Sequence, residues 1–588
     1  MTISPTSRRR QRGAALLALA ALVVLGMSWM LVSALSTAST RAAAQVGQNG
    51  RVLADAKVAL IAWIAMNALD AAENNPGRLP CPQAWGDVGS TNEGRAAASC
   101  SATAIGWLPW RTLGLTVPYD ASGHQLWYIV SPGWHLVPFG GNLTINSNTP
   151  GQLTLDGRAA VALIIAPGSA LYTAPNAAQL AAGCTARSQS QALSLPAIAP
   201  NPLDFLECYA GSSFTSAVAD NATNKVLNDQ VVAITAADLL PALEAAIAKR
   251  IERDIVPQLQ GVFASPNWGL AAGSRLYPFA APFANPGPGA GTSDFAGVDG
   301  SYQGLLPFNQ VNCTADPNNP RCLPGAALTS WATTPTAYDA GGWGYIQTQS
   351  CWWEAGNAAH VCEGEYHEND TYPSNPGMRI EMQATLRNVA MGLRAFDTTR
   401  MQVEARDNAT LPWLAQTVNH ALMMNADGSL TIRLWADLPN IDSMGWGTWA
   451  QYRIRIERLV VTDHPLLDPA STGAGSTGWF VRNEWFRLLY YAAAASTTAD
   501  GALPSVGCTS NSNCLRLTVW PGTTPEWNKR ALLILAGRSL ANPPAARPNA
   551  TLTDYLEFGN NDGGTLYEQR PVSRTSLFND RVVVLDAN

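Results

Sequence analysis

The sequence predicts an α+β protein: a long N-terminal transmembrane helix, then an α/β head that carries a mostly antiparallel β insertion domain. The helix is predicted by Ala14–Leu35, a run without charged residues. At about 1.5 Å per residue this run covers a hydrocarbon core of about 30 Å. The β-rich part is predicted by 49 Gly, 39 Pro and 20 Trp with only 14% charged residues. Gly and Pro are typical of the turns that connect short strands.

The predicted span follows a basic cluster, Arg8, Arg9, Arg10 and Arg12. Such a cluster stays in the cytoplasm, so the bulk of the chain is expected outside. Three interpretations remain open: a leader with a retained helix, a cleaved secretory signal, and a twin-arginine signal. The length of the apolar run favours the retained helix, because signal-peptide cores usually have about 7–15 residues.

A second apolar pattern, Arg51–Ala72, predicts that the helix continues into a globular head. Pro76-Gly77 and Pro80-Cys81-Pro82 then end it.

Beyond this helix the pattern changes to short strands and one further helix. Strands are predicted at Val161–Ile165 and Val231–Ile234, and an amphipathic helix at Ala236–Val256 that ends near Pro257. A Trp/Gly-rich β domain is predicted over 263–470, near the Pro/Gly linker Ala281–Gly291. Its clearest alternating strands are Arg379–Leu386, Leu430–Trp435 and Tyr452–Val461.

Three segments recur in the same order along the chain. The pairs are Ala160–Leu171 with Arg530–Leu540, Asp204–Glu207 with Asp554–Glu557, and Leu227–Ile234 with Phe578–Leu585. Ordered self-similarity predicts a tandem duplication, in which the C-terminal part is a partial copy of an earlier module. Independent convergence of strand patterns is the alternative.

The ten cysteines predict disulfides in an oxidising compartment. Metal binding is the alternative, but no CxxC motif occurs. The nearest-neighbour pattern favours, without proving, five local pairs: Cys81/Cys100, Cys184/Cys208, Cys313/Cys322, Cys351/Cys362 and Cys508/Cys514.

The composition argues against nucleic-acid binding and catalysis. The net charge is −6 although four arginines lie in the N-terminal cluster, so the remaining surface should repel phosphates. There are only six His, and no HExxH, GxSxG or P-loop motif occurs. We therefore expect no enzyme; an envelope hydrolase that uses Glu363 and Glu365 is the weakest alternative.

The string Arg8–Leu17 (RRRQRGAALL) resembles the N-terminus of type IV minor pilins and type II secretion pseudopilins, whose leader ends in Gly before an apolar helix. The resemblance implies cleavage between Gly13 and Ala14. Mature pilins usually carry Glu at the fifth position, where this chain has Ala18. Tip-type subunits also lack that Glu, and an unpaired carboxylate at membrane depth would be costly.

The head adds to this resemblance. Three further segments are similar to large-headed pilin-like proteins. These are RLPCP at Arg78–Pro82, LPWRTLGL at Leu108–Leu115, and Asp120–Tyr128 with an echo at Asn483–Tyr491. The implied organisation is a leader at 1–13, a transmembrane helix at 14–35, pilin-like module 1 at 36–262, the β domain at 263–470 and pilin-like module 2 at 471–588.

The resemblance implies a non-catalytic minor subunit, such as a tip subunit, of a type IV pilus or type II secretion-like filament. It would lie in the bacterial inner membrane with its bulk in the periplasm, or in a filament at the cell surface. The implied partners are other pilin or pseudopilin subunits, the inner membrane and the prepilin peptidase. The alternative is a membrane-anchored or secreted adhesin or carbohydrate-binding protein.

Two groups of residues are candidate ligand sites. No cofactor is expected unless a Gly-rich segment holds Ca²⁺ through side-chain oxygens; these are Glu557, Asn560, Asp562 and Glu568. Aromatic rings of the β domain could stack on sugars or peptides, although core packing explains the same residues; these are Trp343, Trp352 and Trp353.

Overall fold

The computed structural model shows a mixed α and β protein whose sheets are mostly antiparallel. The chain forms two compact units: unit 1 is Met1–Trp63, Arg78–Gly141 and Pro150–Ala236, and unit 2 is Ile64–Gly77, Asn142–Thr149 and Ala237–Asn588. The residues described are 9–100, 104–135, 144–169, 206, 211–216, 219–220, 225–263, 277, 279–283, 295, 301–307, 331–337, 344–357, 359–368, 378–386, 394–396, 398–407, 409–424, 430–438, 450–457, 461–463, 472, 475–494, 514–541, 544–572 and 577–587.

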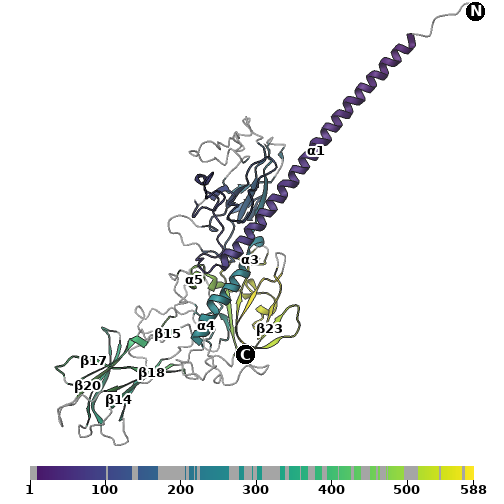
Figure 1. Ribbon diagram of the computed structural model, residues 1–588. Helices are drawn as coiled ribbons and strands as arrows, with labels where there is room; N and C mark the ends of the chain where they lie inside the picture. Colours follow the sequence, from purple (N-terminus) through teal and green to yellow (C-terminus); the bar gives the residue numbers. More distant parts are fainter. Residues whose placement is uncertain are drawn as a thin grey trace, which may run out of the picture. The chain divides into compact units, whose positions relative to one another are not determined.

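Helix α1 runs from Arg9 to Leu69, a length of 61 residues (Figure 1). Ala and Leu dominate it and no Pro interrupts it, which favours one continuous helix. Its side chains from Leu19 to Met30 form a short apolar stretch that is exposed, with Trp29 77% accessible.

One helical stretch of the described chain, Ala43–Leu69, is long and apolar enough to cross a membrane. The same stretch buries a stripe of residues three or four positions apart, as a helix packed on a core does. These residues are Leu53, Ala56, Leu60, Ile64 and Ala68. The predicted apolar positions Val58 and Met66 are exposed instead. Length and composition therefore do not by themselves assign Ala43–Leu69 to a membrane.

The C-terminal end of α1 belongs to unit 2, where two arginines satisfy its last carbonyl groups. Arg250 donates to the carbonyl oxygens of Ala68 and Ala71 at 3.3 and 3.4 Å. Arg253 donates to the carbonyl oxygen of Leu69 at 2.8 Å. Cations at a helix C-terminus also interact favourably with the helix dipole.

Unit 1 contains a four-stranded antiparallel sheet beside the C-terminal part of α1 (Figure 1). Its order is β1 (Ala104–Trp107), β2 (Trp127–Val130), β5 (Ala162–Ala166) and β9 (Gln230–Ile234). Every residue of β2 and β5 is buried, because both strands are central. Lys57 of α1 donates to the carbonyl oxygen of Ala233 in β9 at 2.9 Å.

Smaller elements complete the described part of unit 1. Strands β3 and β4 are joined by Asp156 and Gly157, both at positive φ, as a tight Asp-Gly hairpin requires. The bounds are η1 (Trp85–Asp87), β3 (Leu153–Leu155), β4 (Arg158–Ala160), β6 (Ser213–Phe214), β7 (Ala219–Asp220) and β8 (Lys225–Val226).

Unit 2 begins with a helix in three consecutive parts, α3 (Ala236–Arg250), η3 (Ile251–Ile255) and α4 (Val256–Phe263). The predicted end near Pro257 is wrong, because a π-helical turn at η3 carries the helix past this proline. Gln260 of α4 donates to the carbonyl oxygen of Leu585 at 2.6 Å, so the helix packs on strand β26 (Arg581–Ala587).

The main sheet of unit 2 has the order β10 (Gln303–Leu305), β22 (Leu489–Ala493), β24 (Glu526–Leu535), β23 (Leu515–Val519) and β25 (Leu566–Gln569). Strand β26 also pairs with β24. Short helices flank these strands: α5 (Gly478–Arg482), η10 (Trp485–Leu488), η12 (Leu552–Asp554) and η13 (Phe558–Asn561).

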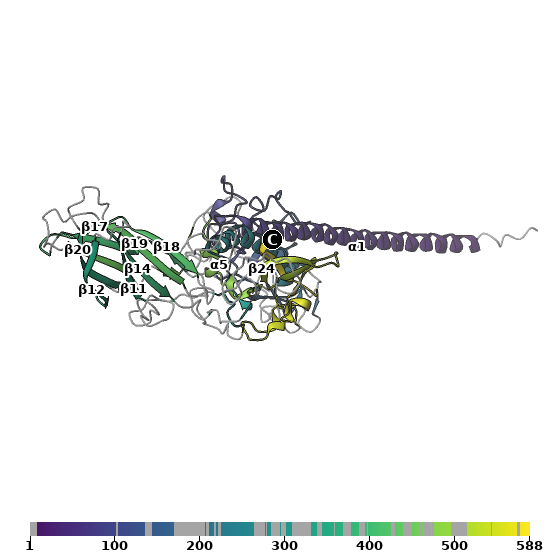
Figure 2. The same ribbon diagram turned by 90° about the horizontal axis from the view of Figure 1, so that it is seen from below.

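The segment between β10 and β22 contains a β-sandwich (Figure 2). One sheet has the order β11 (Trp331–Ala337), β14 (Met378–Leu386), β19 (Leu430–Leu438) and β18 (Asn419–Met424); the other has β12 (Gly344–Glu354), β13 (Ala359–Glu368), β20 (Ala450–Glu457), β16 (Met401–Arg406) and β17 (Leu414–Ala415). Strands β15 (Arg394–Phe396) and β21 (Val461–Asp463) form a separate pair, and η7 (Thr398–Arg400) precedes β16.

Each sandwich sheet has one buried and one solvent-facing side. In β20, Tyr452, Ile454 and Ile456 are buried and alternate with partly exposed charged residues. Strand β16 contacts β19 of the other sheet, so the buried sides face each other. The three alternating strands predicted from sequence are present as β14, β19 and β20.

Candidate functional site

The two units contain the same arrangement of four strands. In unit 1 the order is β1-β2-β5-β9, and in unit 2 it is β10-β22-β24 with β26 paired to β24. All the corresponding pairs are antiparallel. Each unit also has a helix that donates a side-chain hydrogen bond to its last strand, β9 or β26.

The register of these strands also agrees. Tyr128 of β2 lies opposite Gly106 on one side and Ile164 on the other. In unit 2, Tyr491 of β22 lies opposite Gly304 and Leu533 in the same way. The predicted echo of Asp120–Tyr128 at Asn483–Tyr491 therefore joins structurally equivalent tyrosines.

A close glycine–asparagine contact follows β5 in unit 1 and is repeated after β24 in unit 2. Asn228 donates to the carbonyl oxygen of Ser169 at 2.6 Å, and Asn579 donates to that of Arg538 at 2.7 Å. The preceding glycines face these asparagines: a Cβ on Gly168 would lie 3.0 Å from the nearest atom of Asn228, and one on Gly537 would lie 2.4 Å from that of Asn579. The recurring Asn-Asp dipeptide of the sequence thus marks the same hydrogen bond in both units.

One part of this repeated arrangement was missed in the sequence. Gly106-Trp107-Leu108-Pro109 corresponds to Gly304-Leu305-Leu306-Pro307, and the isolated bridge Gln83–Trp107 corresponds to Ala281–Leu305. The GxLP motif was the available signal. This motif marks β10, the first strand of the main sheet of unit 2, which precedes the sandwich in the chain. The sandwich is therefore inserted between β10 and β22, the first two strands of that sheet. The echo at Asp204–Glu207 lies mostly outside the described residues.

Gly13 and Ala14, the expected leader cleavage site, lie in the helical backbone of α1. The two disulfides that the described residues show are Cys81–Cys100 and Cys351–Cys362, both as predicted. Cys514 is buried. The remaining predicted cysteines, Cys184, Cys208, Cys313, Cys322 and Cys508, lie outside the described residues.

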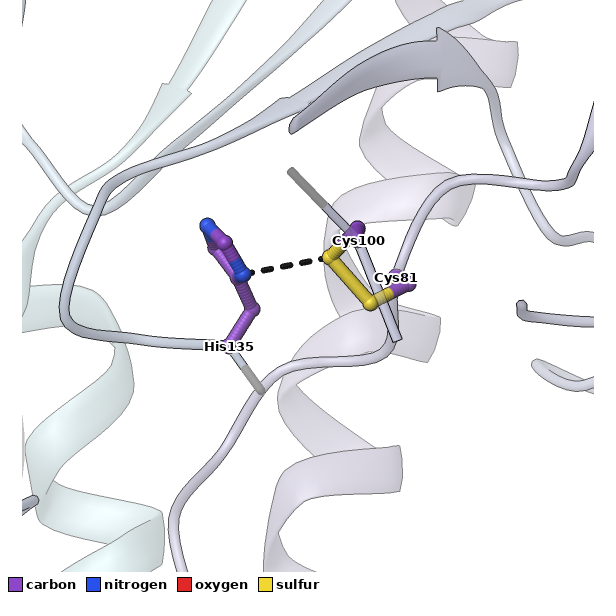
Figure 3. The surroundings of a disulfide bond; sticks show 3 residues. All are labelled: Cys81, Cys100 and His135. Carbon is purple, nitrogen blue, oxygen red and sulfur yellow. Dashed lines mark hydrogen bonds between the residues drawn. A yellow bond between two sulfur atoms is a disulfide. The ribbon is translucent and has the colours of Figure 1, made fainter. Parts of the chain in front are cut away.

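The first disulfide has a histidine against it (Figure 3). Nδ1 of His135 lies 3.1 Å from Sγ of Cys100. His135 is fully buried and Cys81 is 4% exposed, whereas Cys100 is half-buried. Among the described residues this is the group of three His, Cys or acidic side chains whose ligand atoms lie within 4.8 Å of one another. The sequence pattern did not identify His135.

Among the described residues, the carboxylates of Glu557, Asp562 and Glu568 do not gather into one ligand group. Glu568 pairs with Arg570, and Asp562 accepts from the backbone N–H of Gly564 at 2.7 Å. The side-chain amide of Asn560 donates to the carbonyl oxygen of Glu568 at 3.1 Å, and its oxygen accepts from the backbone N–H of Glu568 at 2.8 Å.

Glu557 lies instead beside Asp580, which sequence reasoning did not select. Asp580 is fully buried and accepts hydrogen bonds from the backbone N–H of Glu557 at 3.0 Å and the amide of Asn560 at 2.9 Å. Burial, followed by repulsion from Glu557, raises the pKa of Asp580 well above its ordinary value. Glu557 is only partly buried, but burial raises its pKa as well, so the two adjacent carboxyl groups favour holding a proton between them.

The tryptophans selected from sequence occupy different faces. Trp352 is 39% exposed on the outer side of the five-stranded sheet. Its neighbour Trp353 alternates to the other side, where its ring lies 4.7 Å from that of His360. Trp343 lies outside the described residues.

The outer side of this sheet also carries Trp413, which was not selected. Its ring lies 4.2 Å from the guanidinium of Arg406 and 4.4 Å from that of Arg453. Glu363 is paired with Arg453, and Glu365 accepts from Gln451 at 3.2 Å. These carboxylates are thus members of cross-strand polar pairs.

Comparisons with protein-family models, with curated proteins and with solved structures found no match.

Proposed function

We propose that this chain is a membrane-anchored, pilin-like subunit that displays two related head modules and a β-sandwich outside the cytoplasmic membrane. The observation that carries the proposal is α1: one 61-residue helix with an exposed apolar stretch near its start and a buried stripe near its end. The exposed stretch would lie in the membrane or pack on other pilin helices. The buried stripe would anchor the head to it.

The two disulfides support an extracytoplasmic location, because such bonds persist in oxidising compartments. The absence of Glu at Ala18 supports a tip position, where no preceding subunit supplies a partner amine. Assembly, rather than catalytic turnover, would be the activity. The expected partners are pilin or pseudopilin subunits and the prepilin peptidase.

The N-terminus of the mature protein tests this proposal. Protein purified from membranes should begin at Ala14, and Gly13→Leu should accumulate uncut precursor, whereas Gly26→Leu should be processed normally. A mature start beyond residue 35 would instead indicate ordinary secretion and overturn the proposal.

A second candidate function, carbohydrate binding by the displayed sandwich, is favoured by Trp352 and Trp413 on one side of a polar sheet. The exposed Trp352 ring is available to stack on a sugar, while the half-buried Trp413 ring has two guanidinium groups against it. Neighbouring Arg, Glu and Gln side chains can bond sugar hydroxyl groups. Titration calorimetry with cellohexaose and chitohexaose would test it. Trp352→Ala should abolish binding, and Trp520→Ala, which removes a comparably exposed ring elsewhere, should not. Binding by neither sugar would remove this candidate.

A further inference from the structure

The Cys81–Cys100 disulfide is chemically asymmetric. Cys100 is the more exposed of its two cysteines, and its Sγ lies 3.1 Å from Nδ1 of the His135 ring (Figure 3). A thiol beside an imidazole loses its proton more easily, and the thiolate is the nucleophile in disulfide exchange. A buried thiol in apolar surroundings has the opposite tendency.

We propose that Cys100 is the reactive thiol through which this disulfide forms, that His135 is the residue that activates it, and that the co-reactant is the disulfide of a thiol oxidoreductase or of a small disulfide compound. The inference does not depend on the proposed pilin-like function. It requires only the geometry of the three side chains and an oxidising compartment.

The exchange balances in two steps. In the reduced protein, His135 takes the proton of Cys100, and the thiolate attacks the co-reactant's disulfide. That bond breaks, a mixed disulfide with Cys100 forms, and one co-reactant sulfur leaves with a proton. The thiol of Cys81 then loses its proton and attacks Sγ of Cys100, which expels the second co-reactant sulfur as a thiol. Two thiols of this chain are oxidised and one external disulfide is reduced.

The product fixes a loop to the edge of the unit 1 sheet. Gln83, two residues after Cys81, bridges both Trp107 of β1 and Ala96. The bond to Cys100 closes this loop. A thiophilic ion would suit the same three ligand atoms, but the bond between the two sulfurs excludes that use in the oxidised protein.

The test uses the full-length protein with single cysteines of this pair removed. Cys81→Ser leaves Cys100 as the thiol, and Cys100→Ser leaves Cys81. Each would be treated with oxidised glutathione between pH 5 and 9, and the mixed disulfide followed by mass spectrometry. Thiolate absorbance near 240 nm would give the thiol pKa directly.

We expect Cys100 to react at least about fivefold faster than Cys81 at pH 6.5. A lowered thiol pKa raises the thiolate fraction at this pH by more than the accompanying loss of nucleophilicity lowers the rate. His135→Gln in the Cys81→Ser background should remove the advantage and move the pH profile up towards about 8.5, the value of an ordinary thiol.

His124→Ala in the same background is the matched control and should leave the rate and the pH profile unchanged. Gln preserves a hydrogen-bond donor and nearly the volume of His, and circular dichroism would check the fold of each variant. The proposal is wrong if His135→Gln leaves the thiolate titration of Cys100 unchanged, or if Cys81 reacts as fast as Cys100.

Discussion

Glu244 is a carboxyl group enclosed within unit 2. Its Oε1 atom accepts hydrogen bonds from the hydroxyl of Ser147 and the backbone N–H of Arg538, both at 2.8 Å. Its Oε2 atom is buried and has no hydrogen-bond partner among the described residues. Burial raises the pKa of Glu244 to about 7, more than the two hydrogen bonds and the nearby arginines lower it.

This carboxyl should make unit 2 less stable as the pH rises. The folded state binds the proton more tightly than the unfolded state, whose pKa is near 4.5. The stabilisation is therefore complete below about pH 4.5 and is lost as the pH passes through 7. Glu244→Gln should flatten the fall in the unfolding midpoint between pH 5 and 8.

The exposed Glu252→Gln serves as the control and should leave the slope unchanged. Thermal unfolding at several pH values measures how the unfolding midpoint changes with pH. Equal slopes for wild type and Glu244→Gln would contradict the proton binding assigned to Glu244.

Arg250 is a buried cation whose loss should be costly. It is ion-paired with Asp254 at 3.1 Å, and its guanidinium lies 4.4 Å from the Trp479 ring. Arg250→Ala removes this ion pair and the hydrogen bonds to the end of α1, while Arg253 still pairs with Asp254 at 2.6 Å. The change should lower the free energy of unfolding by about 1.5–3 kcal/mol, as for the loss of a hydrogen bond to a charged group. Lys249→Ala breaks an exposed pair and should cost less than about 1 kcal/mol. Urea unfolding that found equal effects would refute this difference.

At the scale of elements, the end of the central strand in unit 2 depends on a glycine without a side chain. A Cβ on Gly537 would lie 2.4 Å from Asn579. Gly537→Ala should therefore destabilise unit 2 by about 1–3 kcal/mol through overpacking. Gly261→Ala in α4, where a Cβ meets nothing within 4 Å, should instead stabilise by up to about 1 kcal/mol. Denaturant unfolding would give both values, and a neutral Gly537→Ala would disprove the contact.

The sequence predicted elements well where periodicity was strong and poorly where another constraint decided. Alternation predicted β14, β19 and β20, and helical spacing predicted the second half of α1. Pro257 predicted a helix end, but the π-helical turn before it keeps the backbone helical. Strand β10 has only three residues, too few for a periodic signal, and only its partners in the sheet define it.

The candidate sites were harder to predict because each depends on residues far apart in the chain. Local spacing identified the Cys81–Cys100 bond, but not the ring of His135. Likewise the segment around Glu557 contained oxygen ligands, whereas the actual neighbour of Glu557 is Asp580, which directly precedes strand β26. Trp352 and Trp413 share a sheet face only because of the strand order β12-β13-β20-β16.

At the scale of the whole molecule, the sandwich should be removable. Leu305 of β10 and Tyr490 of β22 lie opposite each other in the sheet, so the chain enters and leaves the insertion at neighbouring points. Replacing residues 310–474 by a short Gly/Ser linker should leave the remaining protein folded. Circular dichroism and a cooperative thermal transition would show this.

A longer deletion, of residues 310–493, also removes strand β22; it is the control and should abolish cooperative unfolding. Failure of the shorter deletion to fold would show that the inserted segment is required for the sheet.

The arginine pair at the end of α1 has a mechanical consequence. The helix supplies residues to both compact units, and Arg250 and Arg253 hold its last carbonyl groups. A pull on the N-terminal end would therefore reach unit 2 along the continuous backbone of α1, which is also tied to unit 1 by the Lys57 hydrogen bond to β9. Under tension, these hydrogen bonds and the buried stripe would be loaded in shear, the direction in which many small contacts must break together.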